Sequence, residues 1–160
     1  MYNRCIICGS WPVRKARREV TFIMVKATKS ITLEVAEYSS AVSYSDLPPA
    51  LVQRAKEAVI DGLGVMLAGH GSDCARVIRS YLGELGLSGK SSVIGENARL
   101  PAQFAALANG VSGHALDFDD TQISSVPDRV YGLLTHPTIP VLSAALAQAE
   151  ERGAGGKDLL

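Results

Sequence analysis

Aromatic residues are scarce in this sequence: phenylalanine, tyrosine and tryptophan together make up 6% of its 160 residues. Aromatic side chains favour strands, whereas alanine and leucine, which are abundant here, favour helices. The hydrophobic fraction of 47% and the charged fraction of 20% are typical of a soluble globular protein. We therefore expect one all-α domain of ordinary size.

Long apolar runs and a disulfide framework are also lacking. No apolar stretch approaches the roughly 20 residues that a membrane-spanning helix needs, so we expect no membrane partner. The three cysteines, Cys5, Cys8 and Cys74, give an odd count, which fits a reducing compartment and predicts a cytoplasmic protein. Cys5 and Cys8 have the spacing of half a zinc site, but the second pair of ligands is missing. We interpret them as incidental thiols.

The formal net charge is zero, yet the charges are unevenly distributed. Residues 1–30 carry seven basic groups and one acidic group, whereas residues 31–160 carry nine basic and fifteen acidic groups. The basic segment contains no nucleic-acid-binding motif, so we expect no nucleic-acid partner. Glu19 and the lack of a long apolar core argue against a targeting peptide. We interpret residues 1–30 as a disordered N-terminal extension and note Met24 as an alternative start to Met1.

Apolar residues recur at helical spacing through most of the remaining chain. This periodicity, together with proline and glycine at the ends of the runs, predicts helices at about 32–44, 48–69, 73–85, 101–112 and 137–152, and the start of another after Gly155. Asp46 is a plausible N-cap for the second helix. Gly62 and Gly64 inside that helix are tolerable where another backbone approaches closely.

Two other local predictions concern the third helix and its surroundings. We expect the buried side of the third helix to consist of large apolar residues, namely Val77, Ile78, Tyr81, Leu82 and Leu85. His70 is expected in a surface loop, and residues 91–95 form the only extended segment that the pattern predicts.

A block rich in acids and imidazole runs from His114 through Asp117 to Thr121, and His136 follows it in a Thr-His-Pro sequence. Helical spacing predicts that His114, Asp117 and Thr121 share one face, with Asp119 pointing elsewhere. Because imidazole titrates near neutrality, His136 is a candidate acid or base. Asp117 would orient that imidazole or exchange protons itself.

Other interpretations of the same block stay open. Asp119 and Asp120 fit helix N-caps or solvated acids, and His114 fits a packed, hydrogen-bonded side chain. The carboxylates could instead hold Mg²⁺ or Ca²⁺, but their spacing differs from an EF-hand loop and the ligands are too few. We therefore expect no metal. The start of the helix after His136 would favour a bound anion.

Four sequence blocks resemble the N-terminal portion of the MmgE/PrpD family. They occur in the expected order at residues 61–69, 106–110, 114–121 and 136–147. The family includes 2-methylcitrate dehydratases, cis-aconitate decarboxylases and an iminodisuccinate epimerase. The resemblance implies that residues 31–160 form a helical, bundle-like domain that dimerises. It also implies that this domain is truncated and lacks the α/β lid that closes the active-site cleft in complete members.

The resemblance also implies site residues and chemistry. Asp117 and Thr121 match the family's D-x-x-x-T pattern, and His136 matches the histidine of its His-Pro pair. We therefore expect a lyase, without metal or organic cofactor, that acts on a small di- or tricarboxylate such as 2-methylcitrate or cis-aconitate. His136 and Asp117 would be catalytic, while Thr121, His114 and Arg129 would bind substrate.

Two features leave more than one reaction open at this point. Residues 122–135 separate Thr121 from His136 by a longer segment than in the decarboxylase-like members, and such segments shape substrate choice. Half of a two-domain cleft also excludes water poorly. The alternative is therefore a truncated, non-catalytic helical fragment that at most dimerises.

Overall fold

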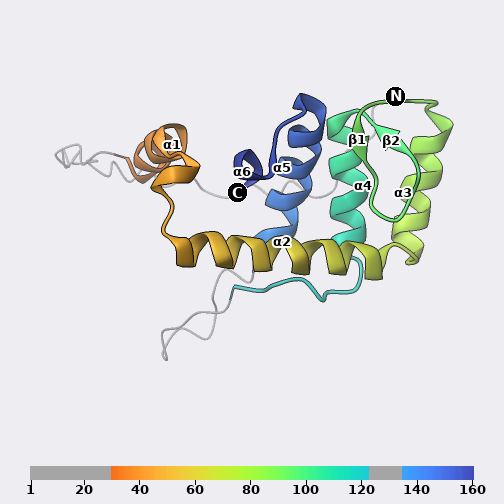
Figure 1. Ribbon diagram of the computed structural model, residues 1–160. Helices are drawn as coiled ribbons and strands as arrows, with labels where there is room; N and C mark the ends of the chain where they lie inside the picture. The colour runs from red at the N-terminus through yellow and green to blue at the C-terminus, as the bar shows by residue number, and fades with distance from the viewer. Residues whose placement is uncertain (1–29, 123–134) are drawn as a thin grey trace, which may run out of the picture. The chain divides into compact units, whose positions relative to one another are not determined.

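The computed structural model describes residues 30–122 and 135–160, and these divide into two units at the boundary between Ala41 and Val42 (Figure 1). The predicted disordered extension at 1–30, Cys5, Cys8 and Arg129 lie outside the described residues, apart from Ser30. Within the first unit the structure describes one helix, α1 (Ile31–Ala41), whose residues are all exposed.

The second unit begins with a short 3-10 helix, η1 (Tyr44–Asp46), which corrects the prediction for Asp46. Asp46 does not cap the following helix. Its carboxylate accepts hydrogen bonds from the backbone N–H of Ser43 at 2.9 Å and from the Ser43 hydroxyl at 2.6 Å. Helix α2 (Pro49–Gly69) starts instead with proline at its first position, where no backbone N–H is needed.

The remaining helices confirm the all-α expectation. They are α3 (Asp73–Glu84), α4 (Ala102–His114), α5 (Thr138–Arg152) and α6 (Gly156–Leu159). Helix α4 is central, since it packs against α2, α3 and α5 (Figure 1). Among the described residues, no helix combines the length and apolar composition that crossing a bilayer requires.

Small residues allow the central helices to approach closely. A Cβ atom at Gly69 would overlap the backbone carbonyl oxygen of Ser112 in α4, and one at Gly62 would overlap the side chain of Leu142 in α5. At Gly62 the close neighbour is therefore a side chain of α5, and not the backbone that we expected there. Gly64 has open space around it, so close packing does not explain the glycine there.

The predicted extended segment at 91–95 is not alone. Strand β1 (Ser91–Ser92) pairs antiparallel with β2 (Arg99–Leu100). The sequence pattern did not predict β2, because two residues are too few to show a strand pattern. Buried Asn109 of α4 attaches this hairpin to the helices: its Oδ1 accepts the N–H of Ile94 and its Nδ2 donates to the carbonyl of Ser92, both at 2.9 Å. Because both amide groups are satisfied, this buried polar residue fixes the position of the hairpin.

Helix α3 departs from its predicted burial. Leu82 is buried and Ile78 is partly buried, but Val77, Tyr81 and Leu85 are exposed. The periodicity is helical, yet α4 covers only one narrow side of α3, so the apolar stripe is wider than the covered surface. His70 is also not a simple loop residue, because it is half-buried, with its Nε2 3.4 Å from Oε1 of Glu96.

The hydrophobic core lies on both sides of α4. One cluster is formed by α3, the hairpin, α4 and α5, and its buried members are Leu82, Val93, Leu100, Ala105, Ala108 and Ala147. The other is formed by α2 and the first turns of α5, and its buried members are Met66, Ile139 and Leu142. The second cluster sets the start of α5 against α2, which also places His136 beside the end of α4.

Candidate functional site

The acidic block does not continue the helix that precedes it. Helix α4 ends at His114, and Asp117 adopts a φ of 57°, in the left-handed region that non-glycine residues rarely occupy. The prediction that His114, Asp117 and Thr121 share one helical face is therefore wrong. The chain turns sharply after His114 and brings a different acid inward.

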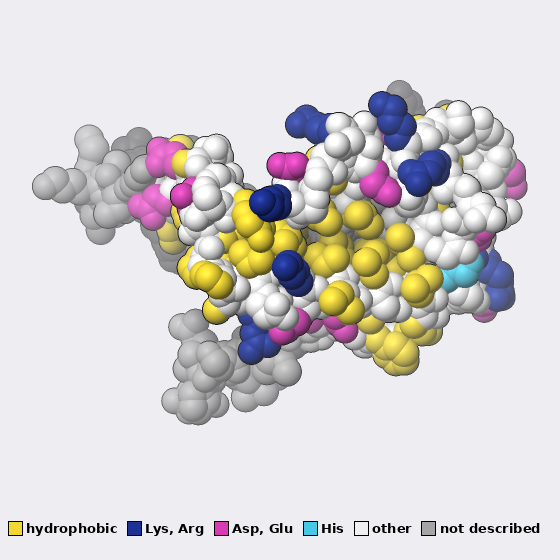
Figure 2. Space-filling model, viewed as in Figure 1, with side chains coloured by type: hydrophobic (Ala, Val, Ile, Leu, Met, Phe, Trp, Pro, Cys, Tyr) yellow, Lys and Arg dark blue, Asp and Glu magenta, His cyan; other side chains and the backbone are white. Residues whose placement is uncertain are grey.

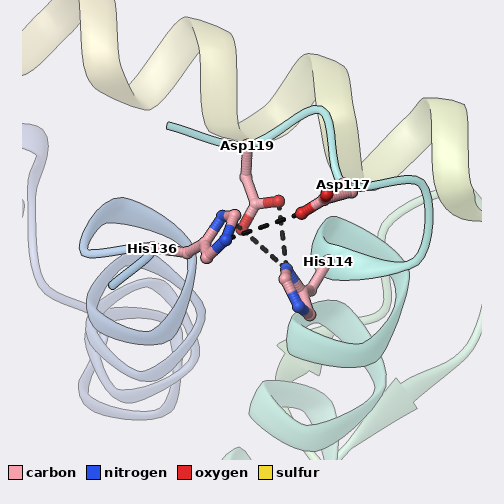
Figure 3. A group of neighbouring side chains, drawn as sticks. All are labelled: His114, Asp117, Asp119 and His136. Atoms are coloured by element: carbon pink, nitrogen blue, oxygen red, sulfur yellow. Dashed lines mark hydrogen bonds and ion pairs between the residues drawn. The ribbon is translucent and has the colours of Figure 1, made fainter. Parts of the chain in front are cut away.

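That acid is Asp119, whose side chain is only 1% exposed. Its two carboxylate oxygens each lie 3.1 Å from Nδ1 of His114, and Oδ2 lies 3.3 Å from Nδ1 of His136 (Figure 3). The expectation that Asp119 points away as a cap or solvated acid is corrected: it is the buried centre of the cluster. The neighbouring Phe118 is 67% exposed. At this turn the charged side chain of Asp119 is therefore buried with its hydrogen-bond partners, while the apolar side chain of Phe118 faces solvent.

His136 lies between two carboxylates. Its Nδ1 faces Asp119, and its Nε2 lies 3.5 Å from Oδ1 of Asp117. The His136 side chain is 22% exposed, whereas that of Asp117 is 79% exposed. A neutral imidazole can donate to only one of the two acids, whereas the imidazolium can donate to both. Both ring nitrogens of His136 therefore have an acidic side chain beside them.

The two imidazoles also contact each other. The ring centroids of His114 and His136 are 4.6 Å apart, with an edge-to-face angle of 67° between the planes. The structure thus brings together three predicted site residues, His114, Asp117 and His136, and adds Asp119 (Figure 3). We call these four side chains the His–Asp cluster.

Asp120 is not the N-cap residue of a helix, since Pro137 has that position in α5, but its side chain satisfies the start of α5 from a distant part of the chain. Its carboxylate accepts the N–H of Thr138, the first residue of α5, at 3.1 Å and the Thr138 hydroxyl at 2.8 Å. A carboxylate at this position also complements the positive end of the helix dipole. The N–H group of Thr138, which we expected to favour a bound anion, is therefore already occupied by Asp120.

Two predicted substrate-binding residues are not placed in the cluster. Thr121 is exposed and lies just beyond Asp119 and Asp120, and Arg129 lies outside the described residues. Their roles stay predictions.

A cavity of about 890 Å³ adjoins the His–Asp cluster. Helices α4 and α5 supply most of its lining, which is largely apolar; polar groups come from His114, Asp119, His136 and Ser143, and Cys74 lies on it from α3. This size and composition are typical of small-molecule sites, in which a few polar groups orient a ligand within apolar walls. Proton-transfer groups therefore border a space that a small ligand can enter.

The same four side chains are also possible metal ligands. One ligand atom from each lies within 4.8 Å of the others, a convergence that sequence spacing did not reveal. His136, however, turns different ring nitrogens toward Asp117 and Asp119, and the N–O distances are 3.1 to 3.5 Å. These contacts form a network of hydrogen bonds and ion pairs, in which a cation would compete with protons for the same atoms.

Comparison with known proteins identifies the chain's relatives. Residues 33–160 match the model of the MmgE/PrpD N-terminal domain. The chain is 33% identical to human cis-aconitate decarboxylase over 138 residues, which are 82% of the chain and 27% of the relative. It is 32% identical to the mouse cis-aconitate decarboxylase over 120 residues, which are 72% of the chain and 23% of the relative.

A fungal relative gives a similar result. The chain is 32% identical to a cis-aconitate decarboxylase-like protein of Aspergillus oryzae over 130 residues, which cover 79% of the chain and 24% of the relative. The chain thus spans about a quarter of the length of these curated relatives. The helical fold agrees with the family match over residues 33–160, and the chain belongs to the MmgE/PrpD family.

Proposed function

We propose that this chain supplies one wall of the active site of a lyase that acts on a small di- or tricarboxylate by acid/base catalysis. The observation that carries the proposal is the convergence of His114, Asp117, Asp119 and His136 beside a cavity of about 890 Å³. Because the relatives at 32–33% identity are named cis-aconitate decarboxylases, cis-aconitate is the first substrate to test.

The cluster provides the groups that decarboxylation needs. When the bond between carbon and the departing carboxylate breaks, the electron pair stays on carbon, CO2 leaves, and a proton must reach that carbon. The His136 imidazolium would deliver the proton from Nε2, which lies 3.5 Å from Asp117 and thus at the more exposed side of the ring. Asp117 would steady the imidazolium, and after the transfer water would supply the proton that returns the neutral ring to the imidazolium.

Dehydration uses the same groups in another order. A base removes a proton next to a carboxylate, and an acid protonates the departing hydroxyl. The two imidazoles, with ring centroids 4.6 Å apart, are close enough to divide these two tasks on one small substrate. We therefore keep dehydration, with 2-methylcitrate as the test substrate, as the second candidate reaction.

The substrate's carboxylates require further partners. We propose that His114, whose side chain is 57% exposed, hydrogen-bonds one carboxylate, and that Thr121 and Arg129 contact another. No metal or organic cofactor enters this proposal, because the steps assigned to the protein's side chains are proton transfers. Since the chain spans about a quarter of its relatives' length, the rest of the site would come from residues outside this sequence.

We further propose a cytoplasmic homodimer. Large apolar side chains are exposed on α2 and α5, including Ile60 at 71% and Val141 at 68%. Figure 2 shows hydrophobic side chains gathered over the region of these helices. Exposed apolar patches of this kind commonly mark protein–protein contacts.

The proposal is tested by expressing the natural gene and assaying the purified protein. CO2 release is followed with cis-aconitate as the substrate, and loss of water is followed with 2-methylcitrate. We expect His136→Ala to lower kcat by about 100-fold or more, because general acid/base catalysis contributes on that scale. His70→Ala is the matched control, since His70 lies outside the His–Asp cluster and should leave kcat unchanged. A chelator should also leave turnover unchanged.

Asp117→Asn provides a second test. Asparagine has nearly the same shape and tolerates the left-handed backbone at this position, so the fold should be kept while the negative charge beside His136 Nε2 is lost. We expect kcat to fall by about 10-fold or more. Wild-type activity in either variant contradicts the assignment, and the absence of turnover with both substrates supports the non-catalytic alternative.

A further inference from the structure

We propose that Asp119 is a positioning residue whose buried carboxylate holds both His114 and His136 in the tautomer with hydrogen on Nδ1. The Nε2 atoms of the two rings are then left to exchange protons with the substrate. This role deepens the proposed function, and its catalytic consequences rest on that function. Helical spacing in the sequence predicts, wrongly, that the Asp119 side chain points away from the site.

The first step of the argument is the burial of a charged group. The Asp119 side chain is 1% exposed, and an ionised carboxylate removed from water must accept hydrogen bonds. Within the described part of the chain, the partners recorded for its oxygens are ring nitrogens: Nδ1 of His114 at 3.1 Å and Nδ1 of His136 at 3.3 Å. Each of these nitrogens satisfies the carboxylate only when it carries a hydrogen.

The second step concerns His136 itself. Its Nδ1 is buried and, among the described residues, has no aligned hydrogen-bond partner, although Oδ2 of Asp119 lies at ion-pair distance. A lone pair at Nδ1 would face the negative oxygen of Asp119 and be repelled by it. Asp117 lies 3.5 Å from Nε2 but is 79% exposed, so water screens its charge, and the buried Asp119 places the hydrogen on Nδ1. In the neutral ring, Nε2 then holds the lone pair and acts as the base. A small rotation on substrate binding would complete the hydrogen bond.

The third step is that one carboxylate serves two rings. Asp119 can compensate one positive charge, whereas His114 and His136, with centroids 4.6 Å apart, would repel each other if both were protonated. Among the residues that the structure describes, the other titratable groups at the site are Asp117, beside Nε2 of His136, and Cys74, on the cavity wall. The shared carboxylate therefore couples the two rings through their Nδ1 atoms.

The direct test is ¹⁵N NMR of histidine-labelled protein at a pH where the rings are neutral. In the wild type we expect His114 and His136 to show hydrogen on Nδ1. In Asp119→Asn the amide NH2 can donate to a ring nitrogen, so at least one ring should change to the form with hydrogen on Nε2. His70 serves as an internal reference, and Asp61→Asn, at an exposed position of α2, is the matched control.

The kinetic test separates positioning from a purely structural role. We expect Asp119→Asn to lower kcat by about 100-fold or more with little change in KM, since a misplaced ring hydrogen impairs proton transfer more than binding. Asp119→Glu, which keeps the charge, should restore the wild-type tautomers and part of the activity. A variant with altered tautomers but wild-type kcat overturns the catalytic role.

Two further outcomes keep the test decisive. Hydrogen on Nε2 of His136 in the wild type overturns the positioning role even if Asp119→Asn does not fold. The predicted tautomers in a protein that turns over neither substrate support the positioning role and refute the proposed function, so the two failures are distinguishable.

Discussion

Three neighbouring acids show how differently the same side chain can be used. Asp117 is exposed beside Nε2 of His136, Asp119 is buried between two imidazoles, and Asp120 accepts hydrogen bonds from Thr138 at the start of α5. The sequence pattern identified the block, and it correctly joined His136 to Asp117. It assigned Asp119 wrongly, because it extended the helix past His114, where the backbone in fact turns into the left-handed region at Asp117.

Another acid at the residue scale gives a prediction for pH. The pKa of Asp46 is held below its ordinary value of 3.8 by the hydrogen bond from the Ser43 hydroxyl and, second, by that from the Ser43 backbone N–H. Because the folded pKa is the lower one, this contribution to stability is present above about pH 4 and is lost as the pH falls through the folded pKa.

Ser43→Ala removes the larger of the two causes and should raise the pKa of Asp46 toward its ordinary value, as followed by NMR titration of its carboxyl carbon. Glu57 is the internal control: hydrogen bonds from Gln53 and Arg54 lower its pKa, and the substitution leaves them in place. An unchanged Asp46 titration in Ser43→Ala would contradict the assigned cause.

At the scale of elements, helix α2 carries glycines of opposite kinds. Gly69 lies where α2 meets the backbone of α4, so Gly69→Ala forces the two helices apart. Overpacking of this kind typically costs about 1–3 kcal/mol. Gly64 is exposed with open space around it, so Gly64→Ala should stabilise the helix by about 0.5–1 kcal/mol.

Thermal unfolding followed by circular dichroism measures both effects in one experiment. Gly69→Ala should lower Tm and Gly64→Ala should raise it. Equal shifts of Tm in the same direction would show that the close approach of α2 and α4 does not determine the loss of stability in Gly69→Ala.

The sequence predicted elements better than their pairing. Periodicity with Pro49, Gly153 and Ser72 at helix ends located α2, α3 and α5 to within about two residues, since these signals are local. The hairpin partner Arg99–Leu100 and the exposure of Val77 were not predicted. Both depend on which other element lies opposite, and that information is absent from a local pattern.

At the scale of the whole molecule, the proposed dimer can be tested on the exposed apolar face. Ile60 is 71% exposed beside Leu159 and Leu160, around a hollow of about 560 Å³, and we place the contact with the second copy there. Light scattering should give twice the 16.9 kDa of one chain for the wild type. Ile60→Glu should shift the mass toward that of one chain, because a charge is costly in an apolar contact.

Val77→Glu is the matched control, since Val77 is similarly exposed but lies on α3, away from this hollow. A wild-type chain of single mass would contradict the dimer, and loss of the dimer in Val77→Glu alone would move the contact to α3.

By itself, the sequence determined the helical class, the approximate helix positions and the family, because helix periodicity, breaking residues and ordered sequence blocks are properties of the chain read along its length. Only the tertiary structure decided which acid meets the imidazoles. His114 and His136 are 22 positions apart in the sequence, and they meet at Asp119 because α4 ends at His114 and packs against α5. A carboxylate becomes the centre of such a site when packing removes it from water and leaves ring nitrogens as its partners.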